Sequence, residues 1–362
     1  MPLPPSYFAD RKIRAVLVDD SATIRSVLRR KLEADGTIEV VGTASDGLEA
    51  LELIQRTRPD VVTLDIEMPR LDGLGTLERL MATHPTPVVM VSSLTREGAD
   101  ATIRALELGA VDFIEKPALA TGVGAVVDDL IAKVRHAAHA RVFKPTAASS
   151  TPRGPAAPSQ STGMANARWR KRIVVIGSST GGPQAVRRVL TALPAGMHVP
   201  VVVVQHMPAG FTRSLADRLN DLGPLRVREA EAGMSLTPGE VLIAPGGYHL
   251  VFDRRGVASL NQEPAEMGVR PAVNVTMASI AQIPLGNPVA VILTGMGSDG
   301  ARGAGLIRQA GGYVISEAES SCVVYGMPRA VFEAGHSDEV LPLDAIADGI
   351  TRQVRDVAAR SA

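Results

Sequence analysis

The chain has 362 residues, and its 38 Lys and Arg are balanced by 38 Asp and Glu, so the formal net charge is zero. A neutral chain lacks the global field that attracts nucleic acid or an anionic membrane, and we expect neither as a partner. Its one cysteine, Cys322, excludes an internal disulfide framework and suits a reducing compartment. The sequence has no signal-peptide layout and no apolar run near the ~18 residues of a spanning helix, so we expect a cytoplasmic protein without membrane insertion.

Length and composition predict two domains joined by a tether. One domain usually takes about 100–200 residues, which is too few for this chain. The segment 144–168 is rich in proline and small polar residues, with almost nothing large enough to pack, and is typical of a linker. We place the first domain at 12–141, the linker at 142–169 and the second domain at 170–358.

Both predicted domains alternate continuous apolar strands with helical segments. The strands before the linker read RAVLVDD, IEVVGTA, DVVTLDI, PVVMVSS and VDFIEKP, and those after it read RIVVIGSS, PVVVVQH, VLIAPG, VAVILTG and GYVISEA. Such runs predict parallel sheets covered by helices on both faces. The expected fold class is therefore α/β, with two doubly wound parallel-sheet domains. Ligands of these sheets gather at the carboxyl ends of the strands, where the polar residues of both halves fall.

In the first domain, three acids and two other polar residues follow the predicted strands. Asp19 and Asp20 end the first strand, Asp65 ends the third, and Ser92 and Lys116 follow the fourth and fifth. Three carboxylates at one sheet edge repel one another unless a hard cation such as Mg²⁺ lies among them. Asp65 could then attack a phosphoryl group while Lys116 balances its charge and Ser92 donates to it. Taken singly, each acid is more simply a solvated strand end.

The segment from Arg14 to Arg135 resembles the response-regulator receiver domain in the motifs LVDDS, LDIEMPRLDG, MVSS and FIEKP. The resemblance implies a flavodoxin-like fold, phosphorylation of Asp65 by a histidine kinase, and Mg²⁺ bound by Asp19, Asp20 and Asp65. Phe113 stands where such domains carry an aromatic switch residue, and a buried core phenylalanine explains it equally well.

The second domain opens with a strand that runs into the sequence GSSTGG. Within it, Gly177 to Gly181 fits the G-x-S-x-G pattern, which places a serine hydroxyl on a sharp turn between a strand and a helix. Such a turn points backbone N–H groups and the positive end of a helix at one spot. It can present Ser179 as a nucleophile, or it can cradle a bound phosphate.

Two further polar residues follow strands of the same predicted sheet. His206 follows PVVVVQ, and Asp299 lies in TGMGSDG after VAVIL. A serine nucleophile needs a base, and the base needs a carboxylate to orient it, so Ser179, His206 and Asp299 form a candidate triad. Asp299 could instead cap the helix predicted at 301–309, because aspartate is a favoured N-cap. We expect Cys322 to be a buried small hydrophobe.

A dinucleotide site is the alternative for the same loop. Gly295 to Gly300 fits G-x-G-x-x-G between a strand and a helix, and Glu317 follows at about the spacing of a ribose-binding acid. This fingerprint normally opens the first βαβ unit of its domain, whereas here it comes late. It also leaves GSSTGG and QHMP unexplained. The resulting alternative is a receiver-regulated nucleotide-binding output module without esterase activity.

The segment from Lys171 to Val357 resembles the catalytic domain of the chemotaxis protein-glutamate methylesterases, with GSSTGG, QHMPAGFT, IAPGG, LTGMGSDGA and SCVVYGMPRA in order. The resemblance implies a Rossmann-like hydrolase that demethylates glutamate γ-methyl esters, and deamidates certain glutamines, on chemotaxis receptors. Ser179, His206 and Asp299 match the family triad. Ser178 departs from the alanine common before the nucleophile, which leaves two candidate hydroxyls. We expect the backbone N–H groups of Thr180 and Met296 to hold the oxyanion.

The combined resemblance implies a receiver-gated enzyme that serves adaptation in chemotaxis. The receiver is expected to cover the active site until phosphorylation of Asp65 weakens that packing. Expected partners are methyl-accepting receptors as substrates and a histidine kinase as phosphodonor, with the enzyme a monomer. Mg²⁺ is expected in the receiver, and no cofactor for ester hydrolysis.

Overall fold

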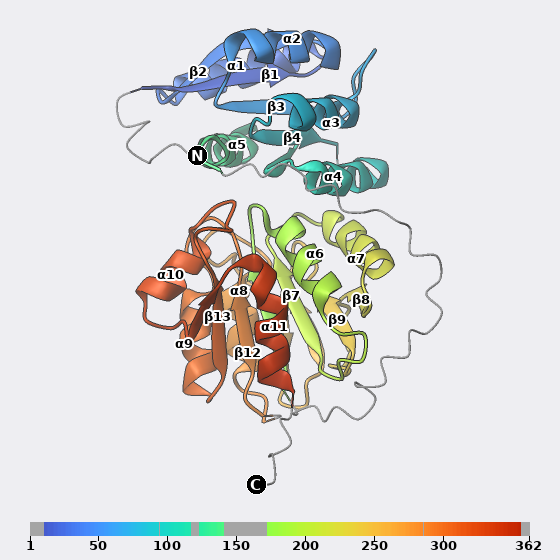
Figure 1. The fold of residues 1–362 in the computed structure, drawn as a ribbon, viewed down its shortest axis with the longest axis vertical. Coiled ribbons are helices and arrows are strands. Elements are labelled where there is room, and N and C mark those ends of the chain that lie inside the picture. The colour runs from blue at the N-terminus through green and yellow to red at the C-terminus, as the bar shows by residue number, and fades with distance from the viewer. Residues whose placement is uncertain (1–10, 94, 117–122, 141–171, 285, 356–362) are drawn as a thin grey trace. The chain divides into compact units, whose positions relative to one another are not determined.

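The computed structural model describes residues 11–93, 95–116, 123–140, 172–284 and 286–355 (Figure 1). The chain divides into two compact units, Met1–Thr146 and Ala147–Ala362. The predicted linker at 142–169 lies outside the described residues. Within the described ranges, no helix is long and apolar enough to cross a membrane.

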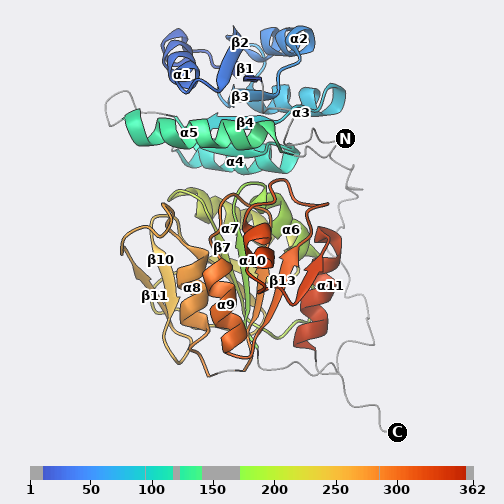
Figure 2. The same cartoon turned by 90° about the vertical axis from the view of Figure 1, so that its left-hand side faces the viewer.

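The first unit is built on a five-stranded parallel sheet with the strand order β2-β1-β3-β4-β5. Its strands are β1 (Ile13–Val18), β2 (Ile38–Ala44), β3 (Val61–Asp65), β4 (Val88–Ser92) and β5 (Asp112–Glu115). Figure 2 shows the helices on its two faces: α1 (Ala22–Ala34) and α5 (Val123–Ala138) on one, and α2 (Gly47–Thr57), α3 (Gly73–Thr83) and α4 (Arg96–Leu108) on the other. Every residue of the central strands β3 and β4 is buried, as their unbroken apolar runs predict.

The second unit holds a seven-stranded sheet with the order β14-β13-β12-β6-β7-β9-β8, in which every pairing is parallel. Its strands are β6 (Val174–Ser178), β7 (Val201–Gln205), β8 (Arg226–Glu229), β9 (Glu240–Ile243), β12 (Val289–Ile292), β13 (Tyr313–Glu317) and β14 (Glu339–Leu341). The helices α6 (Gly182–Ala192), α7 (Phe211–Leu222) and α11 (Leu343–Val354) cover one face, and α8 (Val273–Ile280), α9 (Ala301–Gln309) and α10 (Met327–Glu333) cover the other (Figures 1 and 2).

The order of the strands in this second sheet contains a point at which the direction of winding reverses. The chain starts at the central strand β6, adds β7 on one side, and later adds β12 on the other. The helix after β6 and the helix after β12 therefore lie on opposite faces of the sheet. In such sheets, ligands bind at the carboxyl ends of the strands where the direction of winding reverses. The loops after β6 and β12 carry Ser179 and Asp299, so both residues emerge at this point.

The predicted α/β class is confirmed for both units, and the elements absent from the prediction are short. A two-stranded antiparallel hairpin, β10 (His249–Phe252) with β11 (Ala258–Asn261), packs beside α8. The edge strands β8 and β14 are also absent from the prediction. These elements have only three or four residues and are partly exposed, so they lack the long apolar run that marks the central strands.

Candidate active site and phosphorylation site

The turn after β6 places Ser179 between a strand and a helix, as the sequence predicts. The strand ends at Ser178 and α6 begins at Gly182, whose N–H donates to the Ser179 carbonyl over 2.7 Å. The Ser179 N–H donates to the carbonyl of Thr294 over 3.0 Å, which ties the turn to the end of β12. The Ser179 side chain lies against Gly295, where an added Cβ would come within 2.8 Å of the Ser179 Cβ. The serine is half-buried and stands at the carboxyl edge of the sheet.

The neighbouring Ser178 lies in a different environment. It is fully buried, and its hydroxyl donates to Oε1 of Gln205 over 2.6 Å. A hydroxyl that is buried and already engaged in this way has little access to a substrate. The geometry therefore favours Ser179 as the reactive serine.

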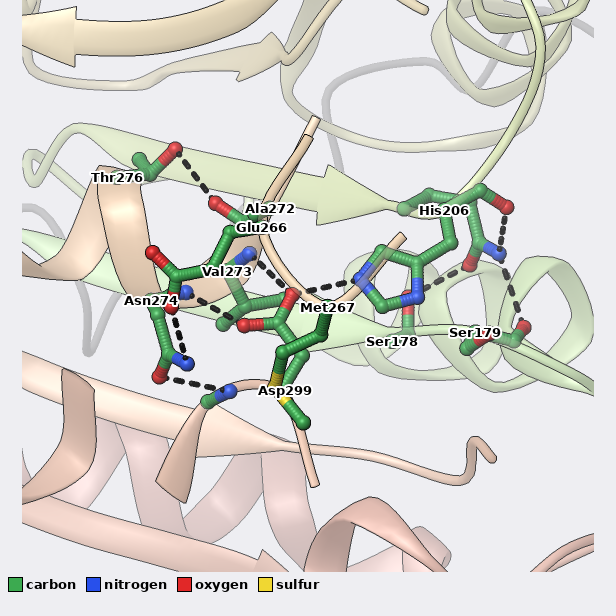
Figure 3. A network of polar contacts seen from close by, with 12 residues as sticks. Ser178, Ser179, His206, Glu266, Met267, Ala272, Val273, Asn274, Thr276 and Asp299 are labelled. Atoms are coloured by element: carbon green, nitrogen blue, oxygen red, sulfur yellow. Dashed lines mark hydrogen bonds and ion pairs between the residues drawn. The ribbon is translucent and has the colours of Figure 1, made fainter. Parts of the chain in front are cut away.

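His206 and Asp299 meet although they are 93 residues apart in sequence. His206 directly follows β7, and its Nε2 lies 2.8 Å from Oδ2 of Asp299. A carboxylate only accepts hydrogen bonds, so this contact puts the proton of the neutral imidazole on Nε2. Nδ1 is then the basic nitrogen. In Figure 3 the imidazole lies between Asp299 and the strand end that carries Ser178 and Ser179.

Asp299 is buried and held as an anion by its surroundings. Its carboxylate accepts hydrogen bonds from the N–H of Val273 at 2.6 Å and from the N–H of Asn274 at 2.9 Å, in addition to His206. Burial would by itself raise the pKa of Asp299, but the hydrogen bond and charge of His206 and the two N–H donors outweigh it and lower that pKa. An ionised carboxylate at this position orients the ring and stabilises its protonated form.

Asp299 does cap a helix, but a different one from the helix that the sequence suggests. Val273 and Asn274 are the first residues of α8, whose own N-cap residue makes no side-chain bond. The helix that follows Asp299, α9, receives its cap from Asn274, whose Oδ1 accepts from the N–H groups of Gly300 and Gly303 at 2.9 and 2.8 Å. The two helices thus exchange caps across the active site (Figure 3).

The dinucleotide alternative is not supported. The acid that would bind a ribose, Glu317, is fully buried and accepts from the N–H of Thr294 at 2.8 Å and from the hydroxyl of Ser321 at 2.9 Å. The loop from Gly295 to Gly300 supplies Asp299 to His206. Both features of the fingerprint are therefore occupied by contacts within the protein.

The proposed oxyanion donors remain predictions. Thr180 is buried, and its carbonyl accepts from the hydroxyl of Thr294 over 3.0 Å, which fixes the turn around it. Since the N–H of Ser179 is already bonded to Thr294, it is no candidate donor. The N–H groups of Thr180 and Met296 stay the candidates.

The first unit brings together the acids that the sequence singles out. Carboxylate oxygens of Asp19, Asp20 and Asp65 lie within 4.8 Å of one another, and Lys116 Nζ lies 2.7 Å from Asp65 Oδ2. Burial raises the pKa of Asp65 to about 6 even though Lys116 lowers it. The Oδ2 atom of Asp19 is buried without a hydrogen-bond partner. An orphaned carboxylate oxygen beside two further acids fits the oxygen ligands that Mg²⁺ prefers.

For two other residues of this unit, Ser92 and Phe113, the contacts bear less directly on the predicted roles. The hydroxyl of Ser92 is buried and donates to the carbonyl of Gly98 over 3.1 Å, while it accepts from Thr102 over 2.8 Å. It is therefore engaged with α4, and its role toward a phosphoryl group stays a prediction. Phe113 is buried with Lys133 Nζ 5.4 Å from its ring centre, in agreement with the core interpretation.

In the second unit, Cys322 is buried, as expected.

Three polar residues of the site are missing from the sequence-based prediction: Gln205, Asn274 and Thr294. Gln205 ends a strand of four buried valines, and a lone amide in such a strand signals a buried hydrogen-bond partner. Asn274 and Thr294 act through contacts with residues far away in sequence. No local pattern reports such contacts.

Fold and site together define a protein of two α/β units, of which the first carries an acidic cluster and the second a candidate Ser-His-Asp site. The CheB methylesterase family matches residues 174–350, and the response regulator receiver domain family matches residues 15–127. A protein-glutamate methylesterase/protein-glutamine glutaminase of Symbiobacterium thermophilum is 53% identical over 95% of this chain and 98% of its own length. A protein of the same name from Pseudomonas aeruginosa is 48% identical over 94% of this chain and 97% of its own.

A solved CheB methylesterase catalytic domain from Thermotoga maritima is 46% identical, with a TM-score of 0.49, and covers 51% of this chain and 98% of its own. The chain belongs to the CheB methylesterase family and carries the receiver domain of a response regulator.

Proposed function

We propose that Ser179, His206 and Asp299 carry out the hydrolysis of glutamate γ-methyl esters on chemotaxis receptors, and the deamidation of certain receptor glutamines. Membership of the family makes the chain a protein-glutamate methylesterase/protein-glutamine glutaminase. The observation that carries the assignment of residues is the His206–Asp299 contact at the switch point of the sheet, beside the turn of Ser179.

The chemistry follows from the tautomer. Nδ1 of His206 takes the proton of the Ser179 hydroxyl as Oγ attacks the ester carbonyl, and it returns that proton to the departing methanol. Water, deprotonated by the same nitrogen, then releases the glutamate carboxylate and frees Ser179. The ionised Asp299 stabilises the protonated ring in both steps. Side chains, backbone N–H groups and water supply every group that these reaction steps use.

The positive end of α6 supports the developing oxyanion. The helix begins at Gly182, three residues after Ser179, so its positive end lies close to the turn. A donor at Thr180 and a second at Met296 are each expected to contribute about 10²- to 10³-fold in rate.

In the receiver, Asp65 is the proposed phosphoacceptor and a histidine kinase the proposed phosphodonor. Asp19, Asp20 and Asp65 would hold Mg²⁺, which neutralises charge on the phosphoryl oxygens when bound. Lys116, already 2.7 Å from Asp65, balances the charge that phosphorylation adds, and Ser92 donates to the phosphoryl group once it turns from α4.

The proposed function is tested by measuring the product of the reaction, methanol. Full-length protein with acetyl phosphate and Mg²⁺ is incubated with a methylated receptor fragment, and methanol release is measured beside NAD and ATP titrations. We expect methanol and no saturable nucleotide binding. Nucleotide binding without methanol would instead establish the output-module alternative.

A further inference from the structure

One buried side-chain amide forms hydrogen bonds with the backbone of both Ser179 and His206. Gln205 is 2% exposed and ends β7, directly before His206. Its Nε2 donates to the Ser179 carbonyl over 2.9 Å and to the His206 carbonyl over 3.1 Å. Dashed lines in Figure 3 at the carbonyl oxygens of the labelled Ser179 and His206 mark these two contacts.

The hydrogen bonds fix the orientation of this amide. Two carbonyl oxygens can only accept, so the NH₂ group must face them, and both of its protons are used. The amide oxygen then faces the Ser178 hydroxyl, which donates to it over 2.6 Å. A side chain with both donors and its acceptor satisfied in a buried site is held in one conformation.

The same contacts account for two small residues beside the amide. A Cβ added at Gly182 would lie 2.0 Å from Oε1 of Gln205, so the first residue of α6 must leave space for the amide. Ser178 acts as the hydroxyl that secures the amide oxygen, which explains a second serine beside the nucleophile without giving it a role in attack.

We infer that Gln205 is a positioning residue that sets the distance between Ser179 and His206 by bonding the backbone carbonyl of each. This inference rests on the proposed function, because it concerns the same serine and histidine. The position of the turn after β6 relative to the end of β7 therefore depends on the side chain of Gln205 as well as on the strand pairing. The last paired residues are Ser178 and Gln205, and one further backbone hydrogen bond runs from the His206 N–H to the Ser178 carbonyl over 3.1 Å, so Ser179 lies beyond the strand pairing.

The test disturbs the amide from two sides in the full-length protein. Gln205→Met keeps the length of the side chain and removes all three hydrogen bonds, while Gly182→Ala leaves the glutamine and pushes against its oxygen. We expect each variant to lower kcat by about 10- to 100-fold with KM changed far less, because a small misplacement of reacting groups acts on the chemical step. The rate at which a fluorophosphonate probe labels Ser179, followed by mass spectrometry, should fall in parallel.

Matched controls separate positioning from general damage. Gln282→Met makes the same chemical change at an exposed position, and Gly196→Ala adds a Cβ where nothing lies within 4 Å. Both controls should keep the wild-type kcat and labelling rate. If Gln205→Met proves unfolded by circular dichroism, Gly182→Ala decides the matter.

The two proposals fail in different ways. A folded Gln205→Met or Gly182→Ala variant with wild-type kcat and labelling rate overturns the positioning role, while the hydrolysis stands. Wild-type protein that releases no methanol overturns the proposed function instead.

Discussion

Two buried carboxylates in the catalytic unit show how the surroundings of an acid set its pKa. Asp299 is surrounded by donors, namely an imidazole and two N–H groups at the start of α8, and its pKa is lowered. For Glu317, burial outweighs the hydrogen bonds from the Thr294 N–H, the Ser321 hydroxyl and the Cys322 thiol, and its pKa is raised to about 6. Asp299 is therefore suited to hold a cation, whereas Glu317 is costly to ionise.

The raised pKa of Glu317 predicts a stability that depends on pH. The folded-state pKa of about 6 lies above the ordinary 4.5, so the folded protein holds this proton more tightly than the unfolded chain. The stabilisation is present below pH 4.5 and is lost as pH rises through 6, with a cost of about 2 kcal/mol at pH 8. Glu317→Gln keeps an acceptor for Thr294 without the charge, so it should raise the Tm of the catalytic domain more at pH 8 than at pH 5.

Differential scanning calorimetry of the full-length protein at both pH values checks this prediction. Glu319→Gln is the matched control, because Glu319 is exposed two residues away. A gain from Glu317→Gln that is equal at pH 5 and pH 8 would show that ionisation is not its cause.

Several of the chemistry-bearing residues could be predicted from the sequence because they end or directly follow a strand of a parallel sheet. Ser179, His206 and Asp65 all fall where an apolar run ends. Gln205 could not be assigned in this way. Its role depends on the carbonyl oxygens around it, and a sequence does not show where carbonyls point.

At the level of elements, the exchange of caps between α8 and α9 holds the candidate carboxylate in place. Asn274 lies at the start of α8 and accepts from the first N–H groups of α9, and its Nδ2 donates to Glu266 over 2.8 Å. Asp299, just before α9, accepts from the start of α8. Each helix therefore depends on the other for the orphan N–H groups of its first turn. A sequence predicts local caps, and these two caps lie 25 to 29 residues away from the N–H groups whose hydrogen bonds they accept.

The exchange makes a prediction for Asn274→Ala. Losing an acceptor for two helix N–H groups should destabilise the domain by about 1–2 kcal/mol. It should also lower kcat, because the loop that carries Asp299 loses its anchor at Gly300. Urea denaturation and methanol release measure the two effects, with Asn261→Ala at the half-buried end of β11 as the control. If kcat is unchanged although stability is lost, the cap formed by Asn274 does not position Asp299.

At the level of the whole molecule, strand composition predicts the class of both domains but not their topology. Continuous buried strands indicate parallel sheets, and both sheets are parallel throughout. The order in which the strands pair is set by contacts across the chain. The place of β6 between β7 and β12, where the direction of winding reverses, is therefore known only from the structure.

Gating by the receiver yields a prediction for the whole chain. A fragment of residues 165–362 should release methanol without a phosphodonor, whereas the full-length protein should need one, because removing the receiver removes the proposed cover. Initial rates with and without acetyl phosphate measure this, and Asp65→Asn in the full-length protein should stay at the basal rate. Equal rates for fragment and full-length protein without phosphodonor would contradict inhibition by the receiver.

The two adjacent serines give the most direct test of which hydroxyl attacks the ester. Full-length Ser179→Ala and Ser178→Ala are brought to the same level of Asp65 phosphorylation, and methanol release from a methylated receptor fragment is followed. We predict that Ser179→Ala releases no methanol above background, whereas Ser178→Ala loses no more than about tenfold, the worth of one buried hydrogen bond. Turnover that survives in Ser179→Ala, or that vanishes in Ser178→Ala, would contradict the assignment of the nucleophile.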